Sequence, residues 1–174
     1  MKKNRILFLS AVAVVFCAAL SLFIPCIKVL SISNRLDPEK MYCVKANSLK
    51  GYEISYTHSV NKGRVHDCYQ ILDDDTLLLD TTIFVSYGAG IPEPEETPGA
   101  VFTVTERGYE ISNLQRRLKK YLIAVGIIAN HGLTLQYADG DEQYFTMTDL
   151  FAPQTSLVFE VVRVSLFTYM KNKL

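Results

Sequence analysis

The stretch Gly51-Tyr52-Glu53-Ile54-Ser55-Tyr56-Thr57, with the run from Val65 to Leu72 after it, decides the fold class. In the first run, large apolar residues at every second position alternate with polar ones, which is the period of a strand with one buried face. Between the runs stands Asn61-Lys62-Gly63-Arg64, a composition typical of a tight turn. The two runs therefore predict an antiparallel hairpin.

The same pattern continues along the rest of the chain, with turn signals at roughly ten-residue spacing. Further strands are expected at 27–33, 41–46, 76–87, 101–105, 109–112, 121–129, 133–137, 143–147 and 157–167, and a short basic helical turn at 113–120. The Asp-Gly pair within Ala138-Asp139-Gly140-Asp141 predicts one more hairpin. The sequence thus predicts an all-β domain, either an antiparallel β-sandwich or a small barrel.

The N-terminus has the pattern of a membrane signal. Lys2, Lys3 and Arg5 precede Ile6 to Ile24, a segment of 19 residues without a charge. As a helix it would extend roughly 28 Å, about the hydrocarbon thickness of a bilayer. We expect residues 1–25 to form one transmembrane or signal-anchor helix and residues 26–174 an extracytoplasmic β-domain of a single-pass cell-membrane protein. Cleavage as a signal peptide near Cys17-Ala18-Ala19 is the alternative.

Charge and cysteine content narrow the classes of function. The formal net charge is zero, so no long-range field attracts nucleic acid, and we expect no nucleic-acid partner. Within the exported part, Cys43 and Cys68 show no disulfide spacing signature, so both are expected as packed free thiols, although export permits a bridge.

The His58 hairpin carries the first candidate binding residues. A two-residue loop at Lys62-Gly63 would place His58 opposite Asp67 and Ser59 opposite His66. Consecutive strand residues point to opposite faces, and a Gly-x-Ser-x-Gly elbow is missing, so the pattern argues against a hydrolase and predicts no catalytic residue. The two histidines and Asp67 suit zinc, but adjacent ligands on opposite faces cannot share one ion without a bulge. We predict no cofactor and no metal.

A second candidate surface follows the long strand that ends near Phe84. Ser86, Tyr87, Gly88, Gly90 and Pro92 leave the strand in a glycine-rich bend that leads into a loop containing proline and glutamate. Such a bend presents a fixed backbone edge, and interface energy concentrates in aromatic residues. This segment is therefore expected to bind a protein partner, with Tyr87 as the anchor.

Three segments resemble the domain-of-unknown-function 1850 family of small exported proteins. They are Tyr56-Thr57-His58-Ser59-Val60, Val65-His66-Asp67-Cys68-Tyr69 and Phe84 to Pro92, and the similarity extends from about Tyr42 to Val164. No activity is established for this family, so the resemblance implies none for this chain. It does imply an association with transport, because the genes of its members look like neighbours of those of TAXI-type TRAP transporters, which take up organic acids and related solutes.

The expected function is that of a non-enzymatic, membrane-anchored accessory or interaction protein. Its partners would be a membrane or solute-binding subunit of such a transporter and, through residues 6–24, the membrane itself. A small-ligand or metal-binding module centred on the His58 hairpin is the first alternative. An unrecognised hydrolase is the second.

Overall fold

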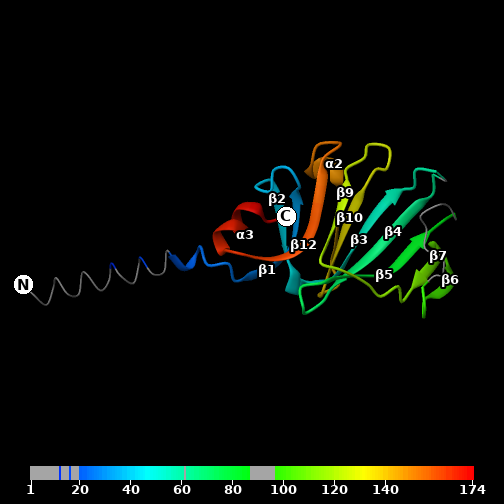
Figure 1. Cartoon of the computed structure of the whole chain (residues 1–174), viewed down its shortest axis with the longest axis horizontal. Coiled ribbons are helices and arrows are strands. Elements are labelled where there is room, and N and C mark those ends of the chain that lie inside the picture. Colours follow the sequence, from blue (N-terminus) through cyan, green and yellow to red (C-terminus); the bar gives the residue numbers. More distant parts are fainter. Residues whose placement is uncertain (1–11, 13–15, 17–19, 61, 87–96) are drawn as a thin grey trace, which may run out of the picture.

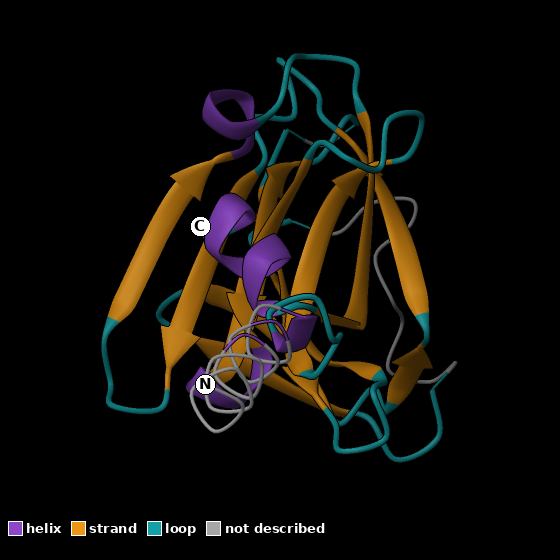
Figure 2. Ribbon diagram, turned by 90° about the vertical axis from the view of Figure 1, so that its left-hand side faces the viewer, coloured by secondary structure: helices purple, strands orange, loops and turns teal. Residues whose placement is uncertain are grey.

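The computed structural model describes residues 12, 16, 20–60, 62–86 and 97–174. Strands dominate this part of the chain and lie in two layers (Figures 1 and 2). Every strand pair within the two sheets is antiparallel, which confirms the all-β, antiparallel prediction. Neither sheet closes on itself as a barrel in these described ranges.

The smaller sheet brings together the two ends of the domain. Its order is β2 (Met41–Lys45), β1 (Ile27–Asn34), β12 (Ser156–Val164) and β9 (Lys120–Ala124). The first strand pairs with the last along its whole length, from Ile27 opposite Val164 to Asn34 opposite Leu157.

The larger sheet contains the predicted hairpins. Its order is β11 (Glu142–Thr146), β10 (Gly132–Tyr137), β3 (Leu49–Thr57), β4 (Arg64–Ile71), β5 (Leu77–Phe84), β7 (Gly108–Ser112) and β6 (Val101–Thr105), with β8 (Arg116–Leu118) also paired to β5. The Asp-Gly prediction is confirmed, since Gly140 takes a positive φ of 96° in the turn between β10 and β11.

One hydrophobic core lies between the two sheets. Leu30 of β1 and Phe159 of β12 are fully buried on the inner face of the small sheet, and they share a cluster with Ile54 of β3 and Leu133 of β10. Short helices cover the margins: η1 (Ala46–Ser48), α2 (Met147–Leu150) and α3 (Leu166–Asn172). On the outer face of the small sheet, α3 buries Tyr169 against Val29 and Cys43.

The predicted last strand, 157–167, is confirmed except for its end, whereas the predicted helical turn at 113–120 is wrong. The last strand ends at Val164, because the Ser165 hydroxyl accepts a hydrogen bond from the Thr168 amide at 3.1 Å and caps α3. The segment 113–120 is not a helical turn. Positive φ angles of 59° at Asn113 and 51° at Gln115 are incompatible with helix, and the chain continues into β8 and β9.

The predicted anchor lies largely outside the described residues. Within the described ranges, no helix combines the length and apolar character that crossing a membrane requires. Within residues 26–174, Cys43 and Cys68 are free thiols.

Candidate functional site

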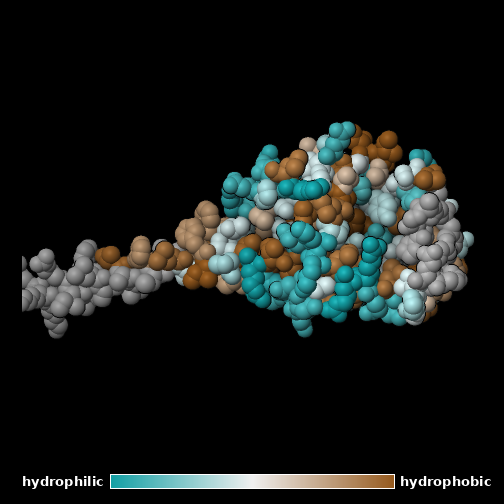
Figure 3. Space-filling model, viewed as in Figure 1, coloured by the Kyte–Doolittle hydropathy of each residue, from teal (hydrophilic) through white to brown (hydrophobic). Residues whose placement is uncertain are grey.

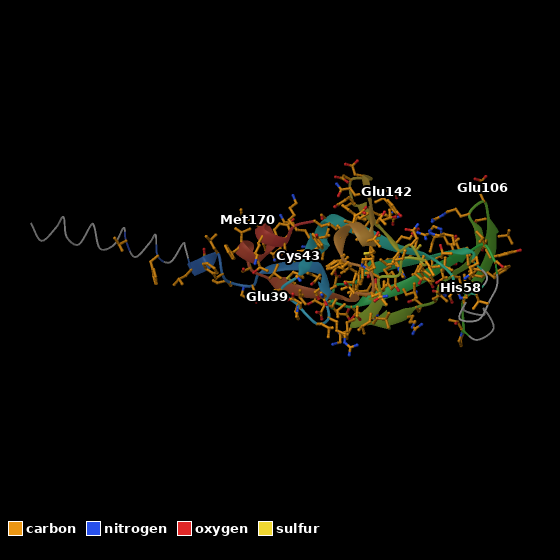
Figure 4. All side chains as sticks on the ribbon, turned by 90° about the horizontal axis from the view of Figure 1, so that it is seen from above. Glu39, Cys43, His58, Glu106, Glu142 and Met170 are labelled. Atoms are coloured by element: carbon orange, nitrogen blue, oxygen red, sulfur yellow. The ribbon has the colours of Figure 1, made fainter. Side chains whose placement is uncertain are left out.

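The predicted His58 pairing is wrong. Strand β3 ends at Thr57, which pairs with Arg64, so the register sets Ile54 opposite Asp67 and Ser55 opposite His66. His58 and Ser59 lie in the loop, which is closed by hydrogen bonds from the His58 amide to Gly63 O (2.8 Å) and from the Lys62 amide to His58 O (3.1 Å). The loop is therefore longer than two residues and displaces the pairing by four positions. Figure 4 shows His58 at the end of the domain opposite Met170.

The remaining predicted residues are not brought together either. His66 and Asp67 are neighbours in β4 and point to opposite faces of the larger sheet, His66 outward and Asp67 inward. Ser86 follows β5 and is exposed. Tyr87, Gly88, Gly90 and Pro92 lie outside the described residues.

On the inner face, a cavity of about 440 Å³ opens between the two sheets. Its walls come from β3, β4, β5 and β8 of the larger sheet, from β9 of the smaller sheet, and from the turn before β10. The lining residues are Ile54, Tyr56, Asp67, Tyr69, Leu79, Thr82, Arg116, Leu118, Tyr121, Leu122, Ile123, Ala124 and His131. Of the predicted site residues that the structure describes, only Asp67 belongs to this cavity.

Asp67 is a carboxylate on the same face of β4 as the buried Val65 and Tyr69. Burial raises its pKa, while hydrogen bonds from Thr82 and Tyr56 and the nearby charge of Arg116 partly oppose this rise. The Thr82 hydroxyl donates to Asp67 Oδ1 at 2.8 Å. Asp67 therefore sits in the cavity wall as a hydrogen-bond acceptor whose ionised form is held by two hydroxyl groups.

Two more polar side chains, Arg116 and His131, line the cavity with Asp67. Arg116 is exposed at the cavity rim and contributes a positive charge. His131 is half-buried, and burial lowers its pKa, which favours the neutral ring. The Gly126 amide donates to His131 Nδ1 at 3.3 Å, so the ring proton belongs on Nε2. The His131 ring also packs on Tyr56, with centroids 5.7 Å apart.

Stacked aromatic rings form the floor of the cavity. Tyr121 lies between Tyr69 and Phe159, with centroid distances of 4.7 Å and 4.9 Å and nearly parallel planes. Tyr52 stacks on Tyr69 at 5.1 Å and receives a hydrogen bond from the Tyr121 hydroxyl at 3.1 Å. Burial raises the pKa of all three phenols, so they remain hydrogen-bond donors at physiological pH.

A separate polar cluster occupies the outer face of the larger sheet. The buried Glu53 carboxylate lies 2.6 Å from His66 Nδ1 and accepts a hydrogen bond from Arg107 Nη2 at 2.8 Å. Burial alone would raise the pKa of Glu53, but the bonds from His66 and Arg107 lower it to about 2. Arg107 belongs to the turn between β6 and β7, so this cluster ties that hairpin to β3 and β4.

In the described part of the chain, neither Ser55 nor Cys68 is placed as an activated nucleophile. Ser55, the residue opposite His66, has its hydroxyl bonded to Arg64 Nη2 at 2.7 Å. Burial and the neighbouring Glu53 raise the pKa of Cys68 to about 12, so this thiol is not a reactive thiolate. Across the described residues, no three His, Cys, Asp or Glu side chains gather as a metal site would require. The inner cavity can bind and orient a solute.

Sequence reasoning missed most of the cavity residues. Tyr56, Thr82 and His131 are not among the predicted site residues, and Arg116 falls in the segment predicted as a basic helical turn. One signal was available: Asp67 occupies the same alternate positions as Val65 and Tyr69, both buried, so β4 carries a carboxylate on its core-facing side.

Comparison with known proteins gives one match. The family described as "Domain of unknown function (DUF1850)" matches residues 52–141. All the residues that line the cavity lie inside this span, whereas β1, β2, β12 and α3 lie outside it. No curated protein and no solved structure matches the chain.

Proposed function

This chain belongs to the DUF1850 family, and from that premise we propose that it is a binding protein whose inter-sheet cavity holds a small polar solute. The observation that carries the proposal is Asp67, a carboxylate facing a cavity of about 440 Å³ inside the part of the chain that defines the family. Concave sites of this size in which a few polar groups converge are the usual form of small-molecule sites.

The groups around the cavity indicate the chemistry of the solute. Asp67 accepts hydrogen bonds, so the solute presents a hydroxyl or an amine to it. Tyr69 and Tyr121 line the cavity and contribute aromatic side chains against which the body of the solute packs. Arg116 at the rim attracts a negative group. A compact molecule that carries both a hydrogen-bond donor and an acidic group satisfies all three.

Binding without turnover fits this arrangement better than hydrolysis. Thr82 is fixed by its bond to Asp67, and neutral His131 accepts a backbone amide rather than a nucleophile's proton. The ligand- or metal-binding alternative centred on the His58 hairpin assumed that His58 lies opposite Asp67, and the structure sets Ile54 there instead.

The proposal is tested by identifying the solute that the protein binds and by asking whether it binds at the inner or the outer face of the larger sheet. The full chain, purified in mild detergent, is analysed by native mass spectrometry for co-purified solutes, and a panel of small hydroxy and amino acids is then screened by thermal unfolding. A solute at a hundredfold excess over its Kd should stabilise the chain by about 2.7 kcal/mol, which raises Tm by roughly 5–10 °C.

Two adjacent residues of β5 provide a matched pair of variants. Thr82→Val removes the hydroxyl that holds Asp67 and should abolish most of the solute-induced rise in Tm. Thr81→Val makes the same change on the outer face, where Thr81 donates to Asp80, and should leave the rise intact. Equal responses in both variants would place the solute elsewhere and overturn the proposal.

A second proposed function is an accessory role for a solute transporter of the TAXI-type TRAP class, with the β-domain held outside the cytoplasmic membrane by residues 6–24. It is supported by the edge strand β6, which in the described residues pairs only with β7 and exposes Val101, Phe102 and Val104 to solvent. An exposed apolar edge strand is a common docking site for another chain.

This second function is tested by recovering the protein from native membranes with its partners. Phe102→Ser should reduce the recovery of transporter subunits. Tyr144→Ser, which changes an exposed aromatic on β11 at the other edge of the same sheet, should not. If both variants retain the same partners as the unaltered chain, β6 is not the contact.

A further inference from the structure

Apolar side chains from two distant parts of the chain meet at one end of the domain. Phe23 and Phe167 pack with their ring centroids 5.3 Å apart, and the Phe167 amide donates to Leu22 O at 3.1 Å. The residues exposed there are Leu22, Phe23, Ile24, Leu166, Phe167 and Met170, which we call the neck patch. Figure 1 shows α3 beside the point where the N-terminal segment leaves the domain, and Figure 3 shows hydrophobic residues at this end.

The neck patch consists of large apolar side chains that are exposed to solvent. Phe167 is 54% exposed and Met170 is 72% exposed, although the opposite side of α3 buries Tyr169 against the small sheet. The helix thus has one side docked on the domain and an apolar side turned away from it. A contiguous exposed apolar surface of this kind marks a contact with a partner or a membrane.

The sequence around the neck patch indicates which partner it is. The charge-free segment Ile6 to Ile24 runs directly into the patch. Lys171 and Lys173 follow on the C-terminal side, and neither 20–24 nor α3 contains an acidic residue. Apolar side chains bordered by lysines are the pattern of a surface that rests at the interface of an anionic bilayer.

We propose that the neck patch is a second membrane contact, in which α3 lies in the headgroup region of the bilayer and holds the domain against it. This contact is independent of the solute cavity. It fixes the orientation of the domain, since Figure 4 shows Met170 at the end opposite His58. The end that carries the His58 loop then points away from the lipid.

The chain contains no Trp, so a single introduced Trp reports on one position. Phe167→Trp probes the neck patch, and Phe102→Trp on β6 is the matched control at another exposed Phe. Both full-length variants are reconstituted in vesicles of phosphatidylcholine and phosphatidylglycerol whose acyl chains carry bromine. Fluorescence at position 167 should fall at least about twofold relative to unbrominated vesicles, because interfacial helices sit at the boundary of headgroups and acyl chains. Position 102 should be unaffected.

A further variant separates docking from simple tethering by the N-terminal segment. Met170→Glu, added to Phe167→Trp, places a negative charge in the neck patch and should abolish the bromine quenching while the segment 6–24 is unchanged. Quenching that persists in this variant would show that the tether alone brings position 167 near the lipid, and would overturn the proposal. Absence of quenching in Phe167→Trp itself would do the same, and would indicate a protein partner for the patch. Equal urea midpoints confirm that the variants are folded.

Discussion

Replacing Arg107 with Gln should destabilise the domain far more than the same change at Arg117. The two arginines make ion pairs of equal length, each with an Nη2 atom 2.8 Å from a carboxylate oxygen. They differ in the acid that they neutralise: the Glu53 side chain is 9% exposed, and the Asp74 side chain is 52% exposed. The comparison therefore isolates the effect of burial on one kind of interaction.

The size of the effect follows from the pKa of Glu53. It falls from a usual 4.5 to about 2 in the folded chain. At 1.36 kcal/mol per pKa unit, its surroundings favour the carboxylate by about 3 kcal/mol. His66 and Arg107 share this contribution, and Arg107 is half exposed to screening solvent, so Arg107→Gln should cost about 1–2 kcal/mol. Arg117→Gln should have little effect on stability, because solvent screens the ion pair between Arg117 and the exposed Asp74.

The pH dependence gives a second test with a definite sign. Because the folded-state pKa of Glu53 lies below the unfolded value, its stabilising contribution is fully present above pH 4.5 and is lost as the pH falls through 2. The difference in unfolding free energy between the unaltered chain and Arg107→Gln should therefore shrink across this window. Urea unfolding followed by circular dichroism at neutral and acidic pH measures it. Equal costs at both arginines, or a difference that does not change in acid, would refute the reasoning.

Three more predictions concern the core, a turn and the cavity. Phe159→Ala should lower the free energy of unfolding by about 3–5 kcal/mol in urea, since this fully buried ring is stacked in the inter-sheet core. Gly108→Ala should lower the free energy of unfolding by about 2 kcal/mol or more, because Gly108 has a φ of 125° and the added Cβ would lie 2.6 Å from Phe84 O. Gly140→Ala should lower it less, because Gly140 also has a positive φ, 96°, but its Cβ would meet no atom within 4 Å. Asp67→Asn should be at least as stable as the unaltered chain at pH 7, because burial raises the pKa of Asp67 and the folded state therefore disfavours its ionised form. The difference in unfolding free energy should disappear below the usual pKa of 3.8, where Asp67 is protonated in both states. A loss of stability at pH 7 would contradict this.

The sequence predicted the strands well because local patterns determine them. Alternation in 52–56 and the Asp-Gly pair at Asp139-Gly140 act over a few residues, and β3, β10 and β11 follow them. For Cys43 and Cys68 it favours packed thiols but leaves a bridge open, and the structure has both as free thiols. What local patterns do not contain is how the two sheets face each other, so the cavity between β9 and β4 had no direct signal.

The register of the β3–β4 hairpin explains why the predicted site was misplaced. The glycine at Gly63 suggested a two-residue loop, but the positive φ of 59° falls on Lys62, and the loop closes on His58. A shift of four positions keeps every side chain on its predicted face, since strands alternate with a period of two. The inward face of Asp67 was therefore predictable, whereas its proximity to Thr82 and Arg116 depends on the register of β5 and on the placement of β8.

The pairing of β1 with β12 also determines when this domain can fold. Hydrogen bonds between Ile27–Asn34 and Ser156–Val164 connect residues more than 120 positions apart, so the small sheet cannot form during synthesis until nearly the whole described chain has emerged. Until then, the inner face of β3 and β10 lacks its cover. A protein exported as an elongating chain would need shielding from aggregation over this interval, and its folding rate would be limited by closure of this one long-range ladder.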